Sequence, residues 1–131
     1  MRKIPRSNDR GAAAVEFALV LIPLLVLLLG IIEFGYIFNQ QLTVTNAARE
    51  GSRVLAITRD AGDGIDAATL AASTLGGTPV ITAPSTCPAT GPGDAKIAVS
   101  LEVDTITGLE AFVPGLGPIT LSGIGVTPCG G

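Results

Sequence analysis

The stretch AAAVEFALVLIPLLVLLLGII, residues 12–32, decides the fold because it is long and apolar enough to cross a lipid bilayer. Glu16 is its only charged residue. A helix rises 1.5 Å per residue, so these 21 residues span roughly 31 Å, which matches a hydrocarbon core of about 30 Å. We therefore expect a transmembrane helix over residues 12–33.

The composition excludes most soluble functions. Of 131 residues, 47% are hydrophobic and 15% are charged, whereas ordinary soluble domains have about 25% charged residues. The chain has no histidine, which excludes Ser-His-Asp catalysis and histidine metal sites. Eight basic residues against eleven acids leave no surplus to neutralise nucleic-acid phosphates. We expect no enzyme activity, no cofactor, no metal, no nucleic acid and no small-molecule substrate.

The charges on either side of the apolar stretch predict its orientation. Residues 1–10 carry four basic residues and one acid, whereas residues 12–131 carry four basic residues and ten acids. Basic flanks stay in the cytoplasm, so the N-terminus should be cytoplasmic and the remainder extracytoplasmic. A cleavable secretory signal is less suitable, because the uncharged run 17–32 is longer than usual and no small-x-small site follows it. The prediction is a single-pass protein of the cytoplasmic membrane.

Glu16 needs a partner. A carboxylate within a membrane helix costs about 2.5–3.5 kcal/mol when central, and such residues are usually paired. Arg10 is six positions away, which does not suit an i,i+4 pair. A cut between Gly11 and Ala12 would place a new α-amine four residues before Glu16, on the same helix face.

The segments RGAAAVEFALVLIPLL (10–25) and NAAREGSR (46–53), with the Cys-Gly-Gly ending, resemble the TadE-like minor pilins, or pseudopilins, of the tight-adherence (Tad/Flp) type IV pilus system. The similarity covers residues 10–56 well and the remainder only loosely. The Glu-Phe pair placed five residues after a glycine, together with NAAREGSR about 30 residues later, is the specific part of the pattern.

This resemblance implies that residues 1–11 are a basic prepilin leader. A membrane-embedded prepilin peptidase would cut between Gly11 and Ala12, leaving Glu16 and Phe17 as the fifth and sixth mature residues of the assembly motif. It also implies other Tad/Flp pilins, pilus-assembly membrane proteins and membrane lipid as partners of a structural subunit in an adhesive pilus. The alternative is an uncleaved bitopic membrane adaptor or surface protein. Shaft, tip and basal complex remain open as locations.

Helical spacing continues beyond the membrane, so we expect one helix from about 12 to 59, with 34–59 as its extracytoplasmic extension. Pro23 should bend it, and Glu33 should mark the membrane boundary. Four small residues form a patch that either meets another subunit or packs on the chain's own sheet. Beside it, Glu50 could pair with Arg53 on a solvated face or an arginine could reach another subunit. The patch residues are Ala47, Ala48, Gly51 and Ser52.

Residues 60–131 should form a small extracytoplasmic domain, which makes the fold class α+β. A short helix is expected at 65–75, ended by a Gly-Gly pair. Strands are expected at 79–83, 95–104 and 119–127, in an antiparallel sheet against the helix extension, with a bulge at Gly123.

Cys87 and Cys129 are the only cysteines, and both should face an oxidising compartment, so a disulfide is expected. Its ring of 43 residues predicts a stabilisation of roughly 4 kcal/mol before strain. The acidic segment 60–66 departs from the EF-hand order, and whether it binds Ca²⁺ is left open.

Overall fold

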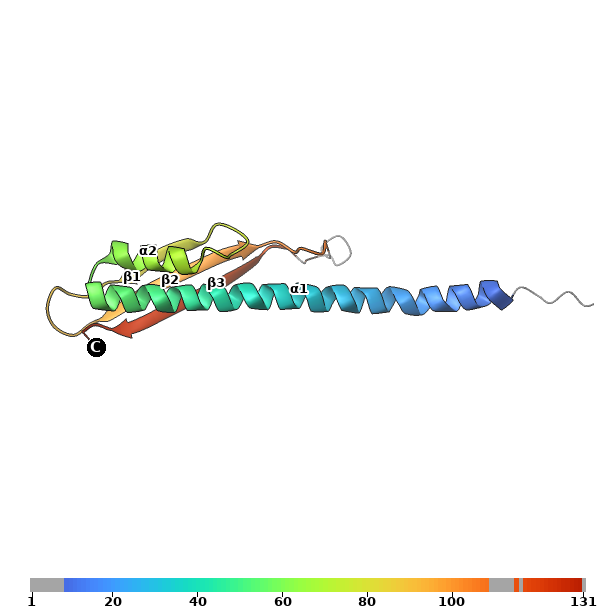
Figure 1. The fold of residues 1–131 in the computed structure, drawn as a ribbon, viewed down its shortest axis with the longest axis horizontal. Coiled ribbons are helices and arrows are strands. Elements are labelled where there is room, and N and C mark those ends of the chain that lie inside the picture. Colours follow the sequence, from blue (N-terminus) through green and yellow to red (C-terminus); the bar gives the residue numbers. More distant parts are fainter. Residues whose placement is uncertain (1–8, 109–114, 116, 131) are drawn as a thin grey trace, which may run out of the picture.

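The structure, a computed structural model, describes residues 9–108, 115 and 117–130. Within these residues, two helices and three strands follow one another: α1 (Asp9–Thr58), α2 (Ala61–Ala71), β1 (Val80–Ser85), β2 (Asp94–Val103) and β3 (Ile119–Pro128). Figure 1 shows α1 as a long rod with α2 and the sheet gathered beside its C-terminal half. The predicted α+β class is confirmed.

Helix α1 is continuous over its 50 residues, close to the predicted range. Pro23 lies inside it, and Figure 1 shows the ribbon passing through this region without a break. Proline costs one backbone hydrogen bond, a loss that long helices can accommodate. The helix ends at Thr58, and the next residue, Arg59, has a φ of 61° and an amide that donates to the Leu55 carbonyl at 2.9 Å. This left-handed residue turns the chain back toward α2.

Helix α2 begins four residues earlier than predicted. The Asp60 carboxylate caps it by accepting hydrogen bonds from the amides of Gly62 at 2.7 Å and Asp63 at 3.3 Å. The segment 60–64 is rich in Gly and Asp, which favour turns, but the cap makes most of it the first helical turn. Gly64 allows α2 to approach α1, since a Cβ there would lie 2.8 Å from the Leu55 Cβ.

The three strands form an antiparallel sheet in the order β1-β2-β3. The pairing of β2 with β3 runs unbroken from Asp94 opposite Pro128 to Val103 opposite Ile119, so the predicted bulge at Gly123 is wrong. An irregularity occurs instead in β1, between Thr82 and Ser85. The sheet therefore presents one regular face to the helices.

The glycines of β3 serve close packing on α1. A Cβ at Gly123 would lie 3.1 Å from the Thr45 Cα, and one at Gly125 would overlap the Ala48 carbonyl. Strand and helix thus meet at backbone distance: a larger residue does not fit at Gly125, and one at Gly123 would require the neighbouring backbone to shift.

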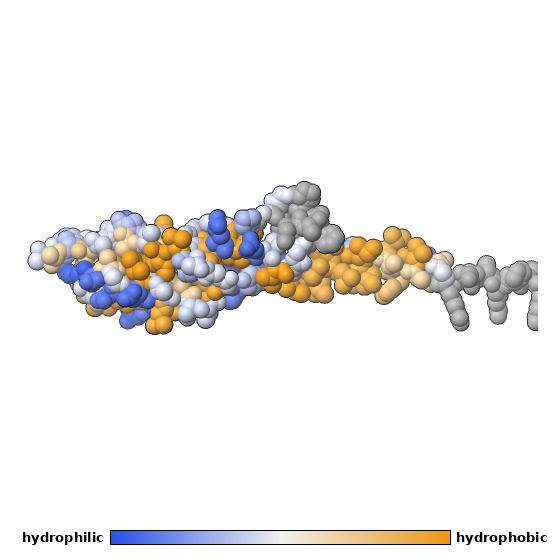
Figure 2. Space-filling view, turned by 90° about the horizontal axis from the view of Figure 1, so that it is seen from above, coloured by the Kyte–Doolittle hydropathy of each residue, from blue (hydrophilic) through white to orange (hydrophobic). Residues whose placement is uncertain are grey.

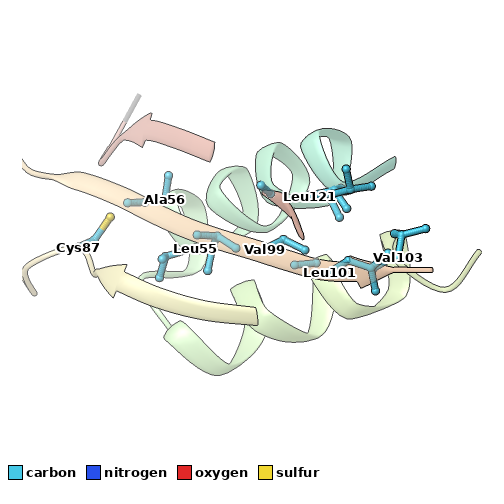
Figure 3. Close-up of a cluster of buried hydrophobic side chains, with 14 residues drawn as sticks. Leu55, Ala56, Cys87, Val99, Leu101, Val103 and Leu121 are labelled. Atoms are coloured by element: carbon cyan, nitrogen blue, oxygen red, sulfur yellow. The ribbon is translucent and has the colours of Figure 1, made fainter. Parts of the chain in front are cut away.

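The core lies between α1, α2 and the inner face of the sheet. Alternate residues of β2 point into it, as the two-residue period predicts, and all are buried. Figure 3 shows the side chains of β2 and α1 packed against one another. The principal members are Val44, Ala48, Leu55, Ala68, Ile97, Val99, Leu101 and Val103.

Candidate functional site

The N-terminal half of α1 has no protein cover. In the described part of the chain, α1 is the one helix long and apolar enough to cross a membrane. Figure 2 shows its free end as an apolar rod projecting from a more polar domain. Large hydrophobic side chains are exposed around the helix, among them Val15, Leu19, Val20, Ile22, Leu24, Leu27, Leu28, Ile31 and Ile32. A surface of this kind is stable in lipid and not in water.

Gly11 and Ala12, the predicted cleavage pair, lie in the first turns of α1 and are exposed. No atom stands within 4 Å of the place where a Gly11 Cβ would be. The basic leader residues Arg2, Lys3 and Arg6 lie outside the described residues. The bond between Gly11 and Ala12 is therefore open to another protein but helical, and cleavage stays a prediction.

Glu16 and Phe17, the predicted assembly motif, are exposed one turn further along the helix. Within the described residues the carboxylate has neither an ion pair nor a hydrogen bond. A charge without a partner in an apolar surface is costly, so Glu16 is a position at which the described residues leave a charge uncompensated.

The small-residue patch packs on the chain's own domain, which was one of the two alternatives. A Cβ at Gly51 would lie 2.7 Å from the Gly64 carbonyl oxygen of α2. Ser52 Oγ donates to the Arg49 carbonyl at 2.9 Å and shares a 3.0 Å hydrogen bond with the Thr127 hydroxyl of β3. The patch residues Ala47, Ala48, Gly51 and Ser52 are all buried. They form the surface of α1 against which α2 and the sheet pack.

The charged side chains beside the small-residue patch face solvent. Arg53 and Glu50 form an i,i+3 pair with 3.8 Å between Nη1 and Oε2, and both side chains are at least half exposed. An exposed pair of this kind contributes under about 1 kcal/mol. Arg49 is likewise exposed.

The contacts of Glu33 are what sequence reasoning missed, since it was taken for a boundary marker. Its side chain is buried, with 5% exposed. The carboxylate accepts hydrogen bonds from the Ile106 amide at 3.1 Å, the Thr107 amide at 3.0 Å and the Thr107 hydroxyl at 2.6 Å. A carboxylate at the end of an apolar run needs such donors, and that need was the available signal.

About two turns above Glu33, Gln40 makes a second polar link between α1 and the domain. It is also buried, and its Oε1 accepts a hydrogen bond from the Gly76 amide at 3.2 Å. The domain is thus tied to the helix from the level of Glu33 upward.

A disulfide closes the opposite end of the domain. Cys87 and Cys129 are bonded, with 5.7 Å between their Cα atoms. The Arg59 guanidinium donates to the carbonyls of Pro88 at 2.7 Å and Ala89 at 2.9 Å. The end of α1, the loop after β1 and the C-terminal end of β3 are therefore joined at one place.

The acidic segment 60–66 shows no arrangement for a metal. Among the described residues, no group of three or more His, Cys, Asp or Glu side chains is placed to hold an ion. The Asp60 carboxylate is already engaged as the cap of α2. The structure gives this segment a local folding role.

Comparison with known proteins finds a family match within helix α1. Residues 11–53 match the model of a family described as TadE-like protein, and this confirms the resemblance. The matched stretch is about a third of the chain and lies within α1. No curated protein and no solved structure matches the chain. The family match thus includes the bare half of α1, Glu33 and all four residues of the small-residue patch.

Proposed function

Because the chain carries a TadE-like segment, a mark of proteins associated with the Tad pilus, we propose that it is a minor pilin or pseudopilin of a Tad/Flp-type adhesive pilus. In this role it is a structural subunit without catalytic activity. The observation that carries the proposal is the continuity of α1, whose N-terminal half is bare and apolar while its C-terminal half is built into a folded domain. Such a subunit can be anchored in the membrane before assembly, and its apolar half can later leave the lipid and pack against other proteins.

The orientation follows from the charge distribution. Four basic residues precede the apolar run, so the N-terminus lies in the cytoplasm and the domain lies outside, where the disulfide is stable. The protein is therefore a single-pass protein of the cytoplasmic membrane before assembly.

Processing by prepilin peptidase would cut between Gly11 and Ala12. The two residues are exposed. Glycine weakens a helix by about 1 kcal/mol relative to alanine, which lowers the free-energy cost of unwinding the first turn so that it can enter a protease active site. The cut removes the basic leader that holds the N-terminus in the cytoplasm. It also creates an ammonium group one helical turn from Glu16.

The bare half of α1 would then pack against other Tad/Flp pilins or pilus-assembly membrane proteins. Burial of apolar surface contributes about 25 cal/mol per Å², so protein neighbours can replace lipid without loss. The Glu16 carboxylate would meet the Ala12 α-amine of its own helix or of a neighbour.

An uncleaved bitopic adaptor is the second candidate, favoured by the observation that the Gly11–Ala12 bond is helical. Mass spectrometry of the chain, produced in its membrane with the cognate peptidase, separates the two. We expect a mature chain that begins at Ala12. The Gly11→Val variant, which places a branched side chain at the cut, should remain full length. A wild-type chain that keeps residues 1–11 beside an active peptidase would refute the pilin proposal.

A further inference from the structure

Glu33 is the only charged residue of α1 between Phe17 and Ala48, and its side chain is buried, so the carboxylate does not lie on the surface of the helix. The segment 105–107 covers it and supplies the amide and hydroxyl donors described above. A desolvated carboxylate with a full set of donors can lie next to lipid, whereas an uncovered one would need water. The described surface of α1 at this level is therefore uncharged.

Apolar side chains are exposed around this level. Phe34 is 70% exposed and Phe38 is 54% exposed, and their rings stack with 6.2 Å between centroids. Ile106, whose amide is bonded to Glu33, has a side chain that is 54% exposed. Exposed apolar side chains are therefore present at this level both on α1 and on the near edge of the domain.

The run of exposed apolar residues on α1 is interrupted a short distance above the membrane span. After Leu42, the next exposed large hydrophobic residue of α1 is Ile57. The positions that follow at helical spacing are Asn46, Arg49 and Arg53, all exposed and polar. A contact with a second copy would be expected to use the length of the helix, whereas contact with a bilayer surface ends at a fixed height. The interruption of the apolar surface above Leu42 favours lipid as the occupant of the surface below it.

The length of the apolar surface agrees with this choice. From Ala12 to Phe38, α1 rises about 40 Å, which exceeds a hydrocarbon core of about 30 Å but fits a bilayer with its headgroup regions, about 40–45 Å. Aromatic side chains are favoured at that level because their rings tolerate the mixed environment of the headgroups.

We propose that Phe34, Phe38 and Ile106 form an interfacial seat that rests in the outer-leaflet headgroup region, and that Glu33 positions the seat by holding segment 105–107 on the helix. The occupant of this surface is the lipid bilayer itself. The inference rests on the membrane anchoring in the proposed function, but not on processing or pilus assembly. Before assembly, the domain would sit on the membrane in a fixed orientation and not sway on a free helix.

The chain has no tryptophan, so single-tryptophan variants of the full chain report one position each. We would place Phe34→Trp and Ile106→Trp variants in phosphatidylcholine–phosphatidylglycerol vesicles that contain lipids brominated near the carbonyl end of the acyl chain. Ile22→Trp, in the middle of the span, and Ile57→Trp, exposed near the far end of α1, serve as references. We expect quenching at positions 34 and 106 and none at 57, with the Ile22→Trp variant quenched by lipids brominated deep in the chain.

Two results would overturn the seat. Quenching of the Ile22→Trp variant without quenching of the Ile106→Trp variant would leave the anchoring intact and show that the domain stands clear of the bilayer. Quenching of the Phe34→Trp variant that falls as the protein-to-lipid ratio rises would show that a second copy covers this surface. If the Ile22→Trp variant is not quenched, the anchoring fails as well, so failure of the proposed function is recognised separately.

Positioning by Glu33 is tested in the Ile106→Trp background. Adding Glu33→Gln should lower the quenching about twofold, because the amide is a weaker acceptor and the segment is released. Glu50→Gln, at an exposed position of the same helix, is the matched control and should change nothing. Thr107→Val removes only the hydroxyl donor and should have a smaller effect in the same direction. Equal quenching in all of these variants, with unchanged circular dichroism, would deny Glu33 this role.

Discussion

The two halves of α1 belong to one continuous helix, but different surroundings complete them. In the C-terminal half the small residues are buried under α2 and the sheet, and the buried polar groups Gln40 and Ser52 have partners within the chain. In the N-terminal half the hydrophobic residues are exposed, and Glu16 has no partner among the described residues. We therefore expect the N-terminal half of α1 to be the half that binds other proteins.

This difference separates residues needed for folding from residues needed for assembly. A substitution at a buried position of the C-terminal half should change the stability of the domain, because these residues pack against α2 and the sheet. A substitution in the N-terminal half should leave the domain unchanged and affect only what happens in the membrane. Variants in the two halves can test this division directly.

The largest functional effect is expected from Glu16→Leu. The leucine removes a charge from an apolar helix, so insertion and cleavage should proceed nearly as in the wild type. Pilus assembly should be lost, because the Ala12 ammonium would be left without its counter-ion in a water-poor contact. Piliation and co-purification with pilus components measure this, in cells with the complete Tad machinery. Glu16→Asp, one methylene shorter, should be partly defective, and normal piliation of the leucine variant would remove the assigned role.

The largest effect on stability is expected from Gly125→Val in the C-terminal half. Its Cβ would overlap the Ala48 carbonyl, and neither strand nor helix backbone can move without disrupting the core. We expect a loss of about 4 kcal/mol or more, which approaches the stability of a domain this small. Limited proteolysis of the detergent-solubilised full chain would show it. Gly35→Val, at a glycine with no atom within 4 Å of its Cβ position, is the control and should keep the domain protease-resistant.

An intermediate effect is expected from removal of the disulfide. Cys129→Ser should lower the free energy of unfolding of the domain by roughly 2–4 kcal/mol, since the ring between Cys87 and Cys129 restricts the unfolded chain. The hydrogen bond from the Cys129 amide to the Gly93 carbonyl at 2.7 Å should remain. Denaturant unfolding measures the change, and membrane insertion should be unaffected. An unchanged midpoint would mean that Arg59 and the strand pairing already hold this end.

Local patterns were sufficient to predict much of the fold. Helical spacing predicted α1 to within about three residues at each end, and two-residue alternation predicted the buried face of β2. Both patterns repeat over many residues, so a single sequence contains them several times. The short helix was misplaced because a single side chain, Asp60, decides where it starts.

Contacts between distant residues could not be predicted in this way. Glu33 is bonded to residues 73 and 74 positions later, and no local pattern connects them. Gly123 was taken for a bulge because the sequence shows a glycine in a strand but not the helix that crosses it. For the same reason the small-residue patch was predicted as a close contact, while its partner, another subunit or the chain's own sheet, was left open.

The smallest effect is expected at the exposed charges of the C-terminal half, and it asks whether this half is truly complete. If Glu50 and Arg53 form only a solvated pair, Arg53→Gln and Glu50→Gln should each change the stability of the domain by less than about 0.5 kcal/mol. Their coupling in a double-mutant cycle should be equally small. Piliation should stay normal, because a partner of the N-terminal half has no need of these charges. Loss of piliation by Arg53→Gln with an intact domain would instead place a neighbouring subunit against the outer half of α1. Residues needed for folding and residues needed for assembly would then lie on different faces of the C-terminal half of α1, and the two roles would not separate by helix half alone.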